Sequence, residues 1–545
     1  MLSRIAHHLA FRPKLVECLR HYTRADLSAD VLAGITVGIV ALPLAMAFAI
    51  ASGVKPEAGI FTAIIAGFII STLGGSRVAI GGPTGAFIVI VYGIVAQYGL
   101  ANLLICTVMA GCILIAMGAL RLGGLIKFIP LPVIIGFTNG IAVLIALSQV
   151  KDFLGLQTGA WPPEFFSQIR TLAETVHTVH WPTFAIAAVS LAMLVLWPQR
   201  WAKRVPGAIV VLVAGGLVVA LFDLPVDTIE TRFGGIPQAL PAFRVPDLSL
   251  EHLRHLIVPA ITIAMLGAIE SLLCAVVADA MIKDKHDANQ ELLAQGVANV
   301  VTPFFGGLPA TGAIARTTVN IRNGARTPVA GIVHAVTLLI IVLAVGPLAN
   351  YIPLACLSAI LVVVAIHMGD WRELRSLTRY SHGRSGTLLL TFVLTVVFDL
   401  TIAVQVGILW ATLLLMRRMA QVTSVARLSD AGNADPRIVT FKARGALFFG
   451  AADKLEAMGA LRDRMARAIV LDLHEVSYMD STATHTLELT YHELRQRGIA
   501  LIVCCAHAQP ASLMRQSGLL AAMGPGGLVP DRAAAYAQAR ASFDV

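Results

Sequence analysis

The chain has 545 residues, of which 57% are hydrophobic and only 13% are charged, against about 25% charged residues in soluble domains. This composition excludes an ordinary soluble protein and indicates a chain that lies largely within a lipid bilayer. The net charge of +9 does not indicate a partner nucleic acid, because the basic residues form no stripe with interleaved aromatic residues. The seven scattered cysteines predict neither a metal site nor a disulfide framework, and no cofactor is expected.

Residues 1–30 are basic and amphipathic, without the apolar stretch of a cleavable signal peptide, and we interpret them as a cytoplasmic lead-in. Beyond them, residues 78–120 and 327–369 contain no Asp, Glu, Lys or Arg. Each of these stretches is long enough to cross the ~30 Å hydrocarbon layer twice, since one crossing takes about 20 residues.

Apolar runs, with the Gly, Pro and charged residues that separate them, predict an α-helical polytopic transport domain over residues 31–421 with 14 transmembrane segments. The third, ninth and tenth segments are short for a full crossing. The predicted segments are 31–52, 58–74, 84–97, 101–119, 127–148, 183–197, 207–222, 256–279, 290–304, 313–322, 328–346, 351–367, 386–399 and 401–417.

Charged residues in the loops predict the orientation. If the N-terminus is cytoplasmic, the loops after even-numbered segments face the cytoplasm, and these loops are basic, whereas the loop after the seventh segment holds Asp223, Asp227 and Glu230. This asymmetry is the one that the positive-inside rule requires. We therefore expect a multi-pass protein of the inner (plasma) membrane with both termini in the cytoplasm. The basic residues are Arg77, Arg121, Lys127, Arg200, Lys203, Arg204, Lys283, Lys285, Arg372, Arg375 and Arg379, with Arg417 and Arg418 behind the last segment.

The pattern of apolar and polar residues changes near the C-terminus. Strand-like runs at 437–444, 468–474 and 499–505 alternate with helix-like stretches at 451–466 and 482–497. Such alternation predicts a small α/β domain over residues 437–545. Residues 422–436, with Ser, Asp, Gly and Asn, are interpreted as the linker.

The functional interpretation rests on a short internal repeat in the sequence, which we call the echo. Residues 81–86 (GGPTGA) open the third segment, and residues 306–313 (GGLPATGA) open the tenth. Seven segments separate them, and an odd offset reverses direction in the membrane, so the two halves would form 7+7 inverted repeats. Matched Gly/Pro-interrupted segments in corresponding positions of two halves indicate a transport site at the repeat interface.

Pro and Gly before both segments predict short helices that begin partway into the membrane. A helix N-terminus presents unpaired N–H groups and a partial positive charge, so two facing N-termini would form an anion site without a buried lysine. The small residues Gly85, Ala86, Ala313 and Ala315 would allow a ligand to approach closely. The alternative is helix packing through small residues, which is common in membranes.

Two ionisable residues lie in apolar surroundings. Glu270 is flanked by apolar sequence on both sides, where an ionised carboxylate costs several kcal/mol to hold, so it is a candidate proton acceptor. The alternative is a structural hydrogen bond to a neighbouring helix. Arg316, one turn into the tenth segment, either adds positive charge to the anion site or pairs structurally with an acid.

In the C-terminal domain, residues 471–482 read as strand, loop and helix start. Asp480 or Ser481 would cap that helix. The functional alternative is a regulatory Ser481, whose phosphorylation would place charge at a helix N-terminus.

Four stretches together resemble the sulfate permease family, known in animals as solute carrier family 26: 34–52, 74–84, 267–279 and, most specifically, 306–328 (GGLPATGAIARTTVNIRNGARTP). The C-terminal part is similar to the STAS domain. Among bacterial members the chain is most similar to aerobic C4-dicarboxylate transporters, through GAIESLLCAVV and PLAMA.

The resemblance implies inverted repeats divided into a core and a gate domain, elevator-like alternating access and a homodimer. It implies an anion site at Gly85–Ala86–Phe87 and Ala313–Ile314–Ala315, next to Arg316, with the coupling acid at Glu270. Sodium-coupled bicarbonate members carry Asp at that position and Thr four residues on, where this chain has Cys274, which favours protons. Many sulfate carriers have Gln after the first-segment proline, where this chain has Leu44.

The leading hypothesis is a proton-coupled symporter of small anions, with dicarboxylate ahead of sulfate and bicarbonate. The alternatives are an anion channel, a sodium-coupled bicarbonate or sulfate carrier, and an enzyme or sensor anchored in the membrane. No phosphate-binding loop, HExxH motif or nucleophile elbow is present, and 14 segments exceed what an anchor needs, so no enzyme is predicted.

Overall fold

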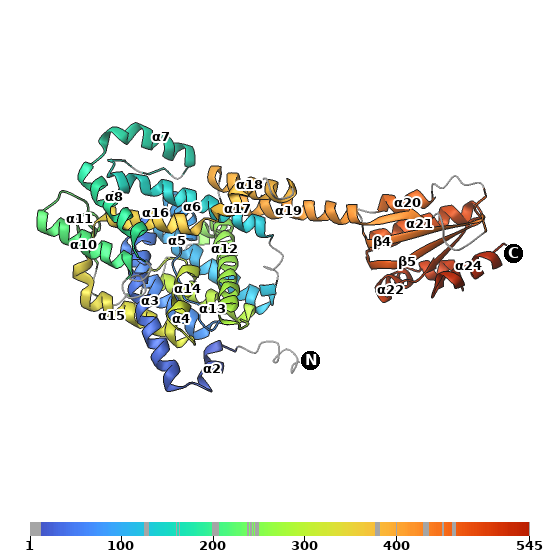
Figure 1. Cartoon of the computed structure of the whole chain (residues 1–545), viewed down its shortest axis with the longest axis horizontal. Helices are drawn as coiled ribbons and strands as arrows, with labels where there is room; N and C mark the ends of the chain where they lie inside the picture. Colours follow the sequence, from blue (N-terminus) through green and yellow to red (C-terminus); the bar gives the residue numbers. More distant parts are fainter. Residues whose placement is uncertain are drawn as a thin grey trace. The chain divides into compact units, whose positions relative to one another are not determined.

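The computed structural model consists of two compact units, residues 1–408 and 409–545, each of which is described by itself (Figure 1). The predicted basic residues Lys127, Arg200, Lys203, Arg204 and Arg379 lie outside the described residues, as do parts of the predicted lead-in and linker. The structure describes residues 12–124, 130–159, 161–162, 164–198, 206–236, 239, 242–243, 245, 250–376, 382–398, 400–428, 435–448, 452–459 and 465–543.

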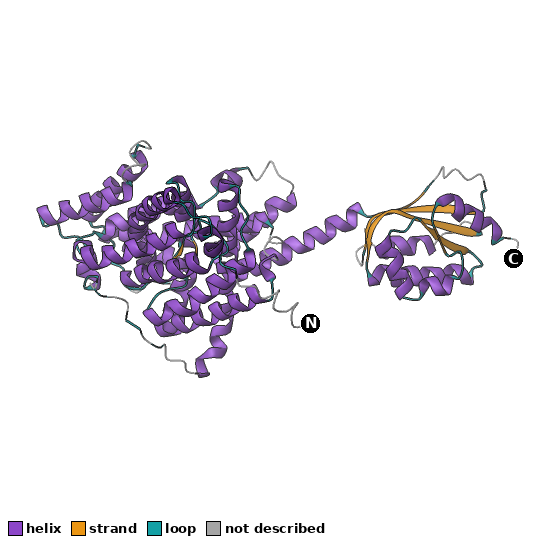
Figure 2. Cartoon of the chain, turned by 90° about the horizontal axis from the view of Figure 1, so that it is seen from below, coloured by secondary structure: helices purple, strands orange, loops and turns teal. Residues whose placement is uncertain are grey.

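The first unit is helical apart from one two-stranded sheet (Figures 1 and 2). Its longer helices are α3 (Arg24–Ala51), α4 (Pro56–Leu73), α5 (Ile88–Ala119), α6 (Leu131–Leu154), α7 (Phe165–Thr175), α8 (Trp181–Leu196), α10 (Gly207–Phe222), α12 (Leu250–Ile282), α13 (Ala288–Val301), α14 (Ile314–Arg322), α15 (Val329–Ala349), α16 (Leu354–Met368), α18 (His382–Val397) and α19 (Leu400–Val422), which runs on into the second unit. The short elements are α2 (Lys14–Leu19), β1 (Gly81–Gly82), η1 (Gly85–Phe87), η3 (Val176–Thr178), α11 (Ile229–Phe233), η4 (Thr302–Phe305), β2 (Thr311–Gly312) and α17 (Trp371–Arg375).

Each predicted transmembrane segment corresponds to one of these helices over most of its described residues; α5 holds the fourth segment and most of the third, and the ninth continues from α13 into η4. Gly99 separates the two parts of α5, because its φ of 82° and ψ of 168° belong to no helix and are open to glycine alone. By length and composition, five described helices can each cross a membrane, or six if the bent pair 165–178 and 181–196 counts as one span. Several other segments lie in shorter helices, and the nine residues of α14 reach only about 14 Å.

The helix contacts have the exchange symmetry expected of two repeats. The second half of α5 packs on α12 and α13, and in the other half of the chain α15 packs on α3 and α4. In the same way, the packing of α6 on α18 in one half corresponds to the packing of α16 on α8 in the other. Strand β1 pairs with its counterpart β2. Helices α6, α8, α16 and α18 contact mainly one another, which separates them from the group around α3–α5 and α12–α15.

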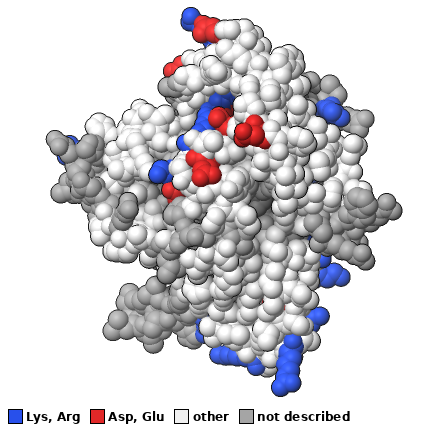
Figure 3. Space-filling model, turned by 90° about the vertical axis from the view of Figure 1, so that its left-hand side faces the viewer, with Lys and Arg blue, Asp and Glu red and all other residues white. Residues whose placement is uncertain are grey.

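The outer surface of this unit suits a lipid environment. Figure 3 shows one face on which charged side chains gather in small patches and most of the surface carries no charge. Helix α10, for example, exposes Val213, Leu217 and Leu221. Large exposed apolar areas mark contact with lipid or a partner rather than with water.

Helix α3 begins at Arg24, seven residues before the predicted first membrane segment, so the last residues of the predicted lead-in are helical. A capping box starts the helix, because Thr23 accepts from the Asp26 amide and Asp26 accepts from the Thr23 amide. Two acidic residues in the first two turns of α3 have partners in the loop before α15. Asp26 lies 3.0 Å from Arg326, and Asp30 is fully buried.

Asp30 is expected to be essential for stability. Its carboxylate accepts from the backbone amides of Arg326 (2.7 Å) and Thr327 (3.0 Å) and from the hydroxyls of Thr327 and Tyr22. Asp30→Ala leaves these donors buried without an acceptor, at about 1–3 kcal/mol each where water cannot enter. We expect the thermal unfolding midpoint in detergent to fall by more than about 5 °C, whereas Glu174→Ala in an exposed pair on α7 leaves it unchanged. An unchanged midpoint for Asp30→Ala would contradict this role.

The second unit contains a five-stranded sheet in the order β3-β4-β5-β6-β7, in which β3 is antiparallel to β4 and the other neighbours are parallel (Figure 2). Helices α20–α22 pack on one face, through Leu455, Leu487 and Met514, and α24 packs on the other through Ala535 and Tyr536. The elements are β3 (Ser424–Arg427), β4 (Ile438–Leu447), α20 (Ala452–Gly459), β5 (Ala468–Met479), α21 (Ser481–Gln496), β6 (Ala500–Cys504), α22 (Ala508–Gln516), α23 (Leu519–Met523), β7 (Leu528–Val529) and α24 (Arg532–Ala541).

The three predicted strands and the predicted helix 482–497 are present, and the predicted helix 451–466 is a helix over Ala452–Gly459, with residues 451 and 460–464 outside the described residues. The predicted linker 422–436 differs from the structure, because residues 424–427 form strand β3 and pair with β4 in the register Ser424↔Arg444 to Arg427↔Phe441. A four-residue edge strand with two exposed side chains has too little apolar alternation to stand out in the sequence.

Candidate functional site

The two glycine-rich segments meet inside the first unit. Strand β1 pairs antiparallel with β2, with Gly81 opposite Gly312 and Gly82 opposite Thr311. The amide of Ala313 extends this pairing by donating to the carbonyl of Ile80 at 2.8 Å. Strand β1 is followed after two residues by η1, and β2 is followed after one residue by α14, so this short sheet connects the segments that lead into the two helices.

Both helices begin without a side-chain cap. Thr84 precedes η1 and Ala313 precedes α14, and neither side chain accepts a hydrogen bond from the first turn. Uncapped first-turn amides are donors available to an anion. Of the predicted binding residues, Gly85, Ala86, Phe87 and Ala313 are buried, Ile314 is partly exposed and Ala315 is exposed.

Gly85 faces the other group of helices. A Cβ at this position would lie 3.3 Å from Ile145 Cδ1 of α6 and 3.5 Å from Met368 Sδ of α16. The start of η1 therefore lies where the group around α3–α5 meets the group around α6 and α16. A site between two such groups is the arrangement that alternating access requires.

Glu270 lies on α12 next to this junction. The hydroxyl of Thr84 donates to Glu270 Oε2 at 2.9 Å, across 186 residues of sequence. The glutamate keeps partial exposure, and no Lys, Arg or His in the described part of the chain lies within 4.0 Å of it. A carboxyl group in this setting has one hydroxyl partner and no counter-ion.

Cys274, one turn further along α12, is fully buried behind β2. Its Sγ lies 3.2 Å from Thr317 Oγ1, which also accepts from the amide of Ile80 at 2.9 Å. A thiol is a poor ligand for a hard cation such as sodium, which prefers oxygen. Cys274 therefore joins α12, α14 and the residue before β1 in a structural contact.

Arg316 is buried at 2% exposure, one turn into α14. Its Nη2 donates to the carbonyl of Pro83 at 2.9 Å, while Nε and Nη1 have no partner among the described residues. The predicted alternative of a pair with an acid is not observed within that set. Gly82, with a φ of 153°, leaves room for this guanidinium, since a Cβ there would overlap Nη1. Arg316 thus supplies positive charge beneath the start of η1.

Two residues next to this region, Thr84 and Glu291, were not predicted from the sequence. Thr84 was part of the quoted motif but received no role, and only the fold shows that it reaches Glu270. Glu291, a second fully buried acid, lies near the start of α13 and accepts from the amides of Gly75 (3.0 Å) and Ser76 (3.2 Å) and from Gln295 (2.9 Å). An acid inside a predicted segment was the signal for Glu291, and its three donors indicate a structural role.

In the second unit, Asp480 caps α21 by accepting from the amide of Ala483 at 2.8 Å. Ser481 is the exposed first residue of that helix, and its regulatory role stays a prediction. Asp472, Cys504 and Cys505 place possible metal ligands within 4.8 Å of one another. Arg532 and the amide of His474 already occupy both oxygens of Asp472, so this carboxylate is not free for a metal.

Sequence profiles match the chain in two places: the Sulfate permease family over residues 27–391 and the STAS domain over residues 433–534. The chain is 41% identical over 509 residues to "Putative sulfate transporter YvdB" of Bacillus subtilis, covering 92% of this chain and 96% of that protein. It is 32% identical over 510 residues to the bicarbonate transporter BicA of a Synechocystis strain, covering 89% of each.

The structure of SLC26A9 matches all of this chain and 94% of its own length, with a TM-score of 0.87 at 18% identity. At that identity the likeness shows the fold alone. It agrees with a helical membrane transporter followed by an α/β domain.

Proposed function

The chain belongs to the sulfate permease family, a family of multi-pass membrane transporters of small anions rather than of enzymes, and from this premise we propose that it is a proton-coupled symporter. The anion binds between the N-termini of η1 and α14, at Gly85–Phe87 and Ala313–Ala315, and Glu270 carries the coupled proton. The group around α3–α5 and α12–α15 forms a core that moves against a gate formed by α6, α8, α10, α16, α18 and α19.

One observation supports this proposal above the others: a carboxyl group and a guanidinium, neither with a counter-ion among the described residues, both bond to the two residues that precede η1. Glu270 bonds to the Thr84 side chain, and Arg316 bonds to the carbonyl of the preceding Pro83. Neither charge neutralises the other, since no ion pair joins them. An anion at η1 would satisfy Arg316 and would be repelled by an ionised Glu270.

This repulsion supplies the coupling. Protonation of Glu270 removes the negative charge beside the anion, so the anion binds more tightly when the proton is bound, and by linkage the proton binds more tightly when the anion is present. The carrier therefore changes conformation either with both ligands bound or with neither. Cys274 offers sulfur where a sodium site needs oxygen, which supports protons over sodium.

The relatives named above support sulfate and bicarbonate as the first substrates to test. Neither relative is described as a dicarboxylate transporter. We therefore place dicarboxylates, predicted from residues 267–277 and 43–47, after sulfate and bicarbonate among the substrates to test. The proposal also includes a homodimer in the plasma membrane, with both termini in the cytoplasm as the loop charges predict.

Uptake by the purified full-length chain in proteoliposomes tests this function. We expect saturable uptake of radiolabelled sulfate driven by an inward proton gradient, with competition by unlabelled bicarbonate and, more weakly, by fumarate. Uptake that follows a sodium gradient and ignores the proton gradient would exclude proton coupling. An ohmic anion current without saturation would instead indicate a channel.

A further inference from the structure

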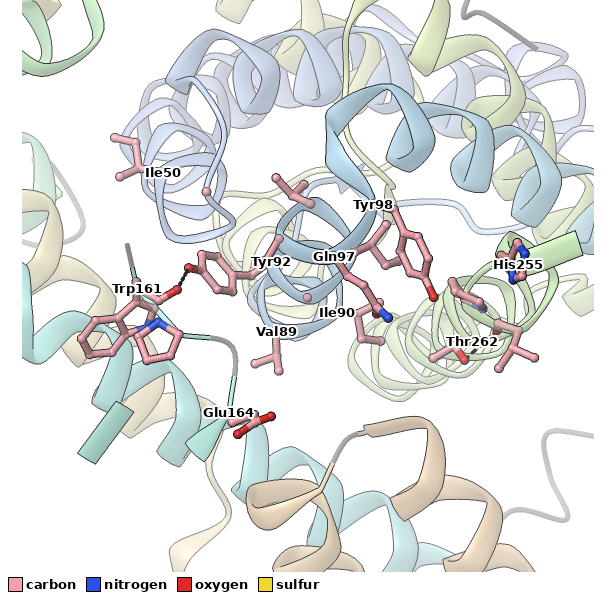
Figure 4. A pocket seen from close by; sticks show the side chains of 18 of the residues that line it. Ile50, Val89, Ile90, Tyr92, Gln97, Tyr98, Trp161, Glu164, His255 and Thr262 are labelled. Atoms are coloured by element: carbon pink, nitrogen blue, oxygen red, sulfur yellow. Dashed lines mark hydrogen bonds between the residues drawn. The ribbon is translucent and has the colours of Figure 1, made fainter. Parts of the chain in front are cut away.

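A second feature lies at the end of the first unit where α3 and α6 finish. Here a cavity of about 1460 Å³ is lined by residues of α3, α5, α6 and α12 (Figure 4). The cavity reaches Val89 and Ile90, in the first turn of α5 just after η1. It also reaches Thr262, which helical spacing places on the same face of α12 as Glu270, about 12 Å away. In the proposed topology this cavity is an outer vestibule above the transport site.

Lys151 stands in the wall of this vestibule with an unbalanced charge. Its Nζ lies 5.2 Å from the centroid of the Trp161 ring, and no carboxylate of the described residues lies within 4.0 Å of it. The adjacent Asp152 is already paired with Arg232 at 2.9 Å. A partly buried ammonium that rests on an aromatic face and has no counter-ion attracts an anion.

Trp161 provides an independent second donor. The residue is only 8% exposed, and its Nε1 has no acceptor among the described residues. Its backbone is fixed, because the hydroxyl of Tyr92 on α5 donates to the Trp161 carbonyl at 2.5 Å, as the dashed line in Figure 4 shows. A buried N–H without an acceptor is costly, and a ligand that brings an acceptor removes that cost.

We infer that Lys151 and Trp161 form a second anion-binding site, in the vestibule, which takes a small oxyanion on its way to the transport site. An oxyanion fits better than a halide, because its separate oxygens accept from the ammonium and from the indole N–H together. The charged lining agrees: Lys151, Arg232 and Arg254 outnumber Asp152 and Glu164. The transport role rests on the proposed function, whereas the binding itself does not.

Tryptophan fluorescence of the purified full-length chain in detergent measures this binding, with sulfate as the probe. We expect a saturable change that is absent in Trp161→Phe, which replaces the indole, both the reporting fluorophore and the N–H donor, with a phenyl ring. Lys151→Gln raises the apparent Kd about tenfold, the loss expected for one charged donor, and Lys151→Arg restores most of it. Lys55→Gln is the matched control, because it removes a charge near the same end of α3 but does not line the vestibule.

Two further experiments distinguish sulfate binding at this site from binding at the transport site and from binding of a lipid headgroup. Glu270→Gln keeps the fluorescence response, because the vestibule does not include that residue. In proteoliposomes, Lys151→Gln raises the KM for sulfate about tenfold with Vmax within twofold of wild type. An equal sulfate response in wild type and Trp161→Phe, an unchanged Kd in Lys151→Gln, or a response to phosphatidylglycerol but not to sulfate would each overturn the inference. Failure of uptake with intact sulfate binding would overturn only the proposed transport function.

Discussion

Replacement of Glu270 by glutamine is expected to abolish proton-driven accumulation of the anion while anion exchange continues. Glutamine has the shape of glutamic acid and can still bond to the Thr84 hydroxyl, but it cannot exchange a proton. A gradient of one pH unit stores about 1.4 kcal/mol per proton, enough for about tenfold accumulation, with the membrane potential held at zero, by a carrier that moves one proton with each anion. We expect that ratio to fall from about ten in the wild type to one in Glu270→Gln.

The measurement is radiolabelled sulfate inside proteoliposomes at steady state, with and without an imposed pH difference, followed by counterflow to measure exchange. Glu230→Gln, an exposed residue of α11, is the matched control and retains accumulation. Thr84→Val removes only the hydroxyl and should weaken coupling without abolishing it. If Glu270→Gln still accumulates sulfate about tenfold, the proton is carried elsewhere and the proposed mechanism fails.

Replacement of Arg316 by glutamine is expected to remove transport almost completely. A buried charged donor contributes about 1.5–3 kcal/mol to an anion that it contacts or to the backbone that it positions. This corresponds to a fall of about 10- to 150-fold in Vmax/KM for sulfate. Lysine does not substitute well, because a guanidinium carries its donors on three separate nitrogens, so that Nη2 can bond to the Pro83 carbonyl while Nε and Nη1 reach other positions, whereas an ammonium carries all its donors on one nitrogen.

Arg322→Gln is the matched control for this prediction. Arg322 lies on the same short helix, but it is exposed at the C-terminal end, away from β1. Thermal unfolding of both variants separates the two roles open to Arg316. If Arg316→Gln unfolds at a lower temperature but transports normally, Arg316 only stabilises the fold, and its place in the anion site is contradicted.

Much of the candidate site could be predicted from local sequence. The echo of 81–86 in 306–313 predicted two broken helices, and the structure pairs them through Gly81 and Gly312. The apolar flanks of Glu270 predicted a buried acid without naming its partner. The partners of Asp26 and Asp30 at the start of α3 could not be named from the sequence, because Arg326 and Thr327 lie about 300 residues away along the chain.

The sequence by itself determined which stretches enter the bilayer and where helices break, because hydropathy and the conformational freedom of glycine and proline are properties of neighbouring residues. Only the tertiary structure decided that Thr84 reaches Glu270, that Arg316 turns toward Pro83, and that Lys151 and Trp161 share one wall of a vestibule. Each of these contacts joins side chains or backbone groups from different elements. Such contacts depend on how helices pack against one another, and no local pattern of residues encodes that packing.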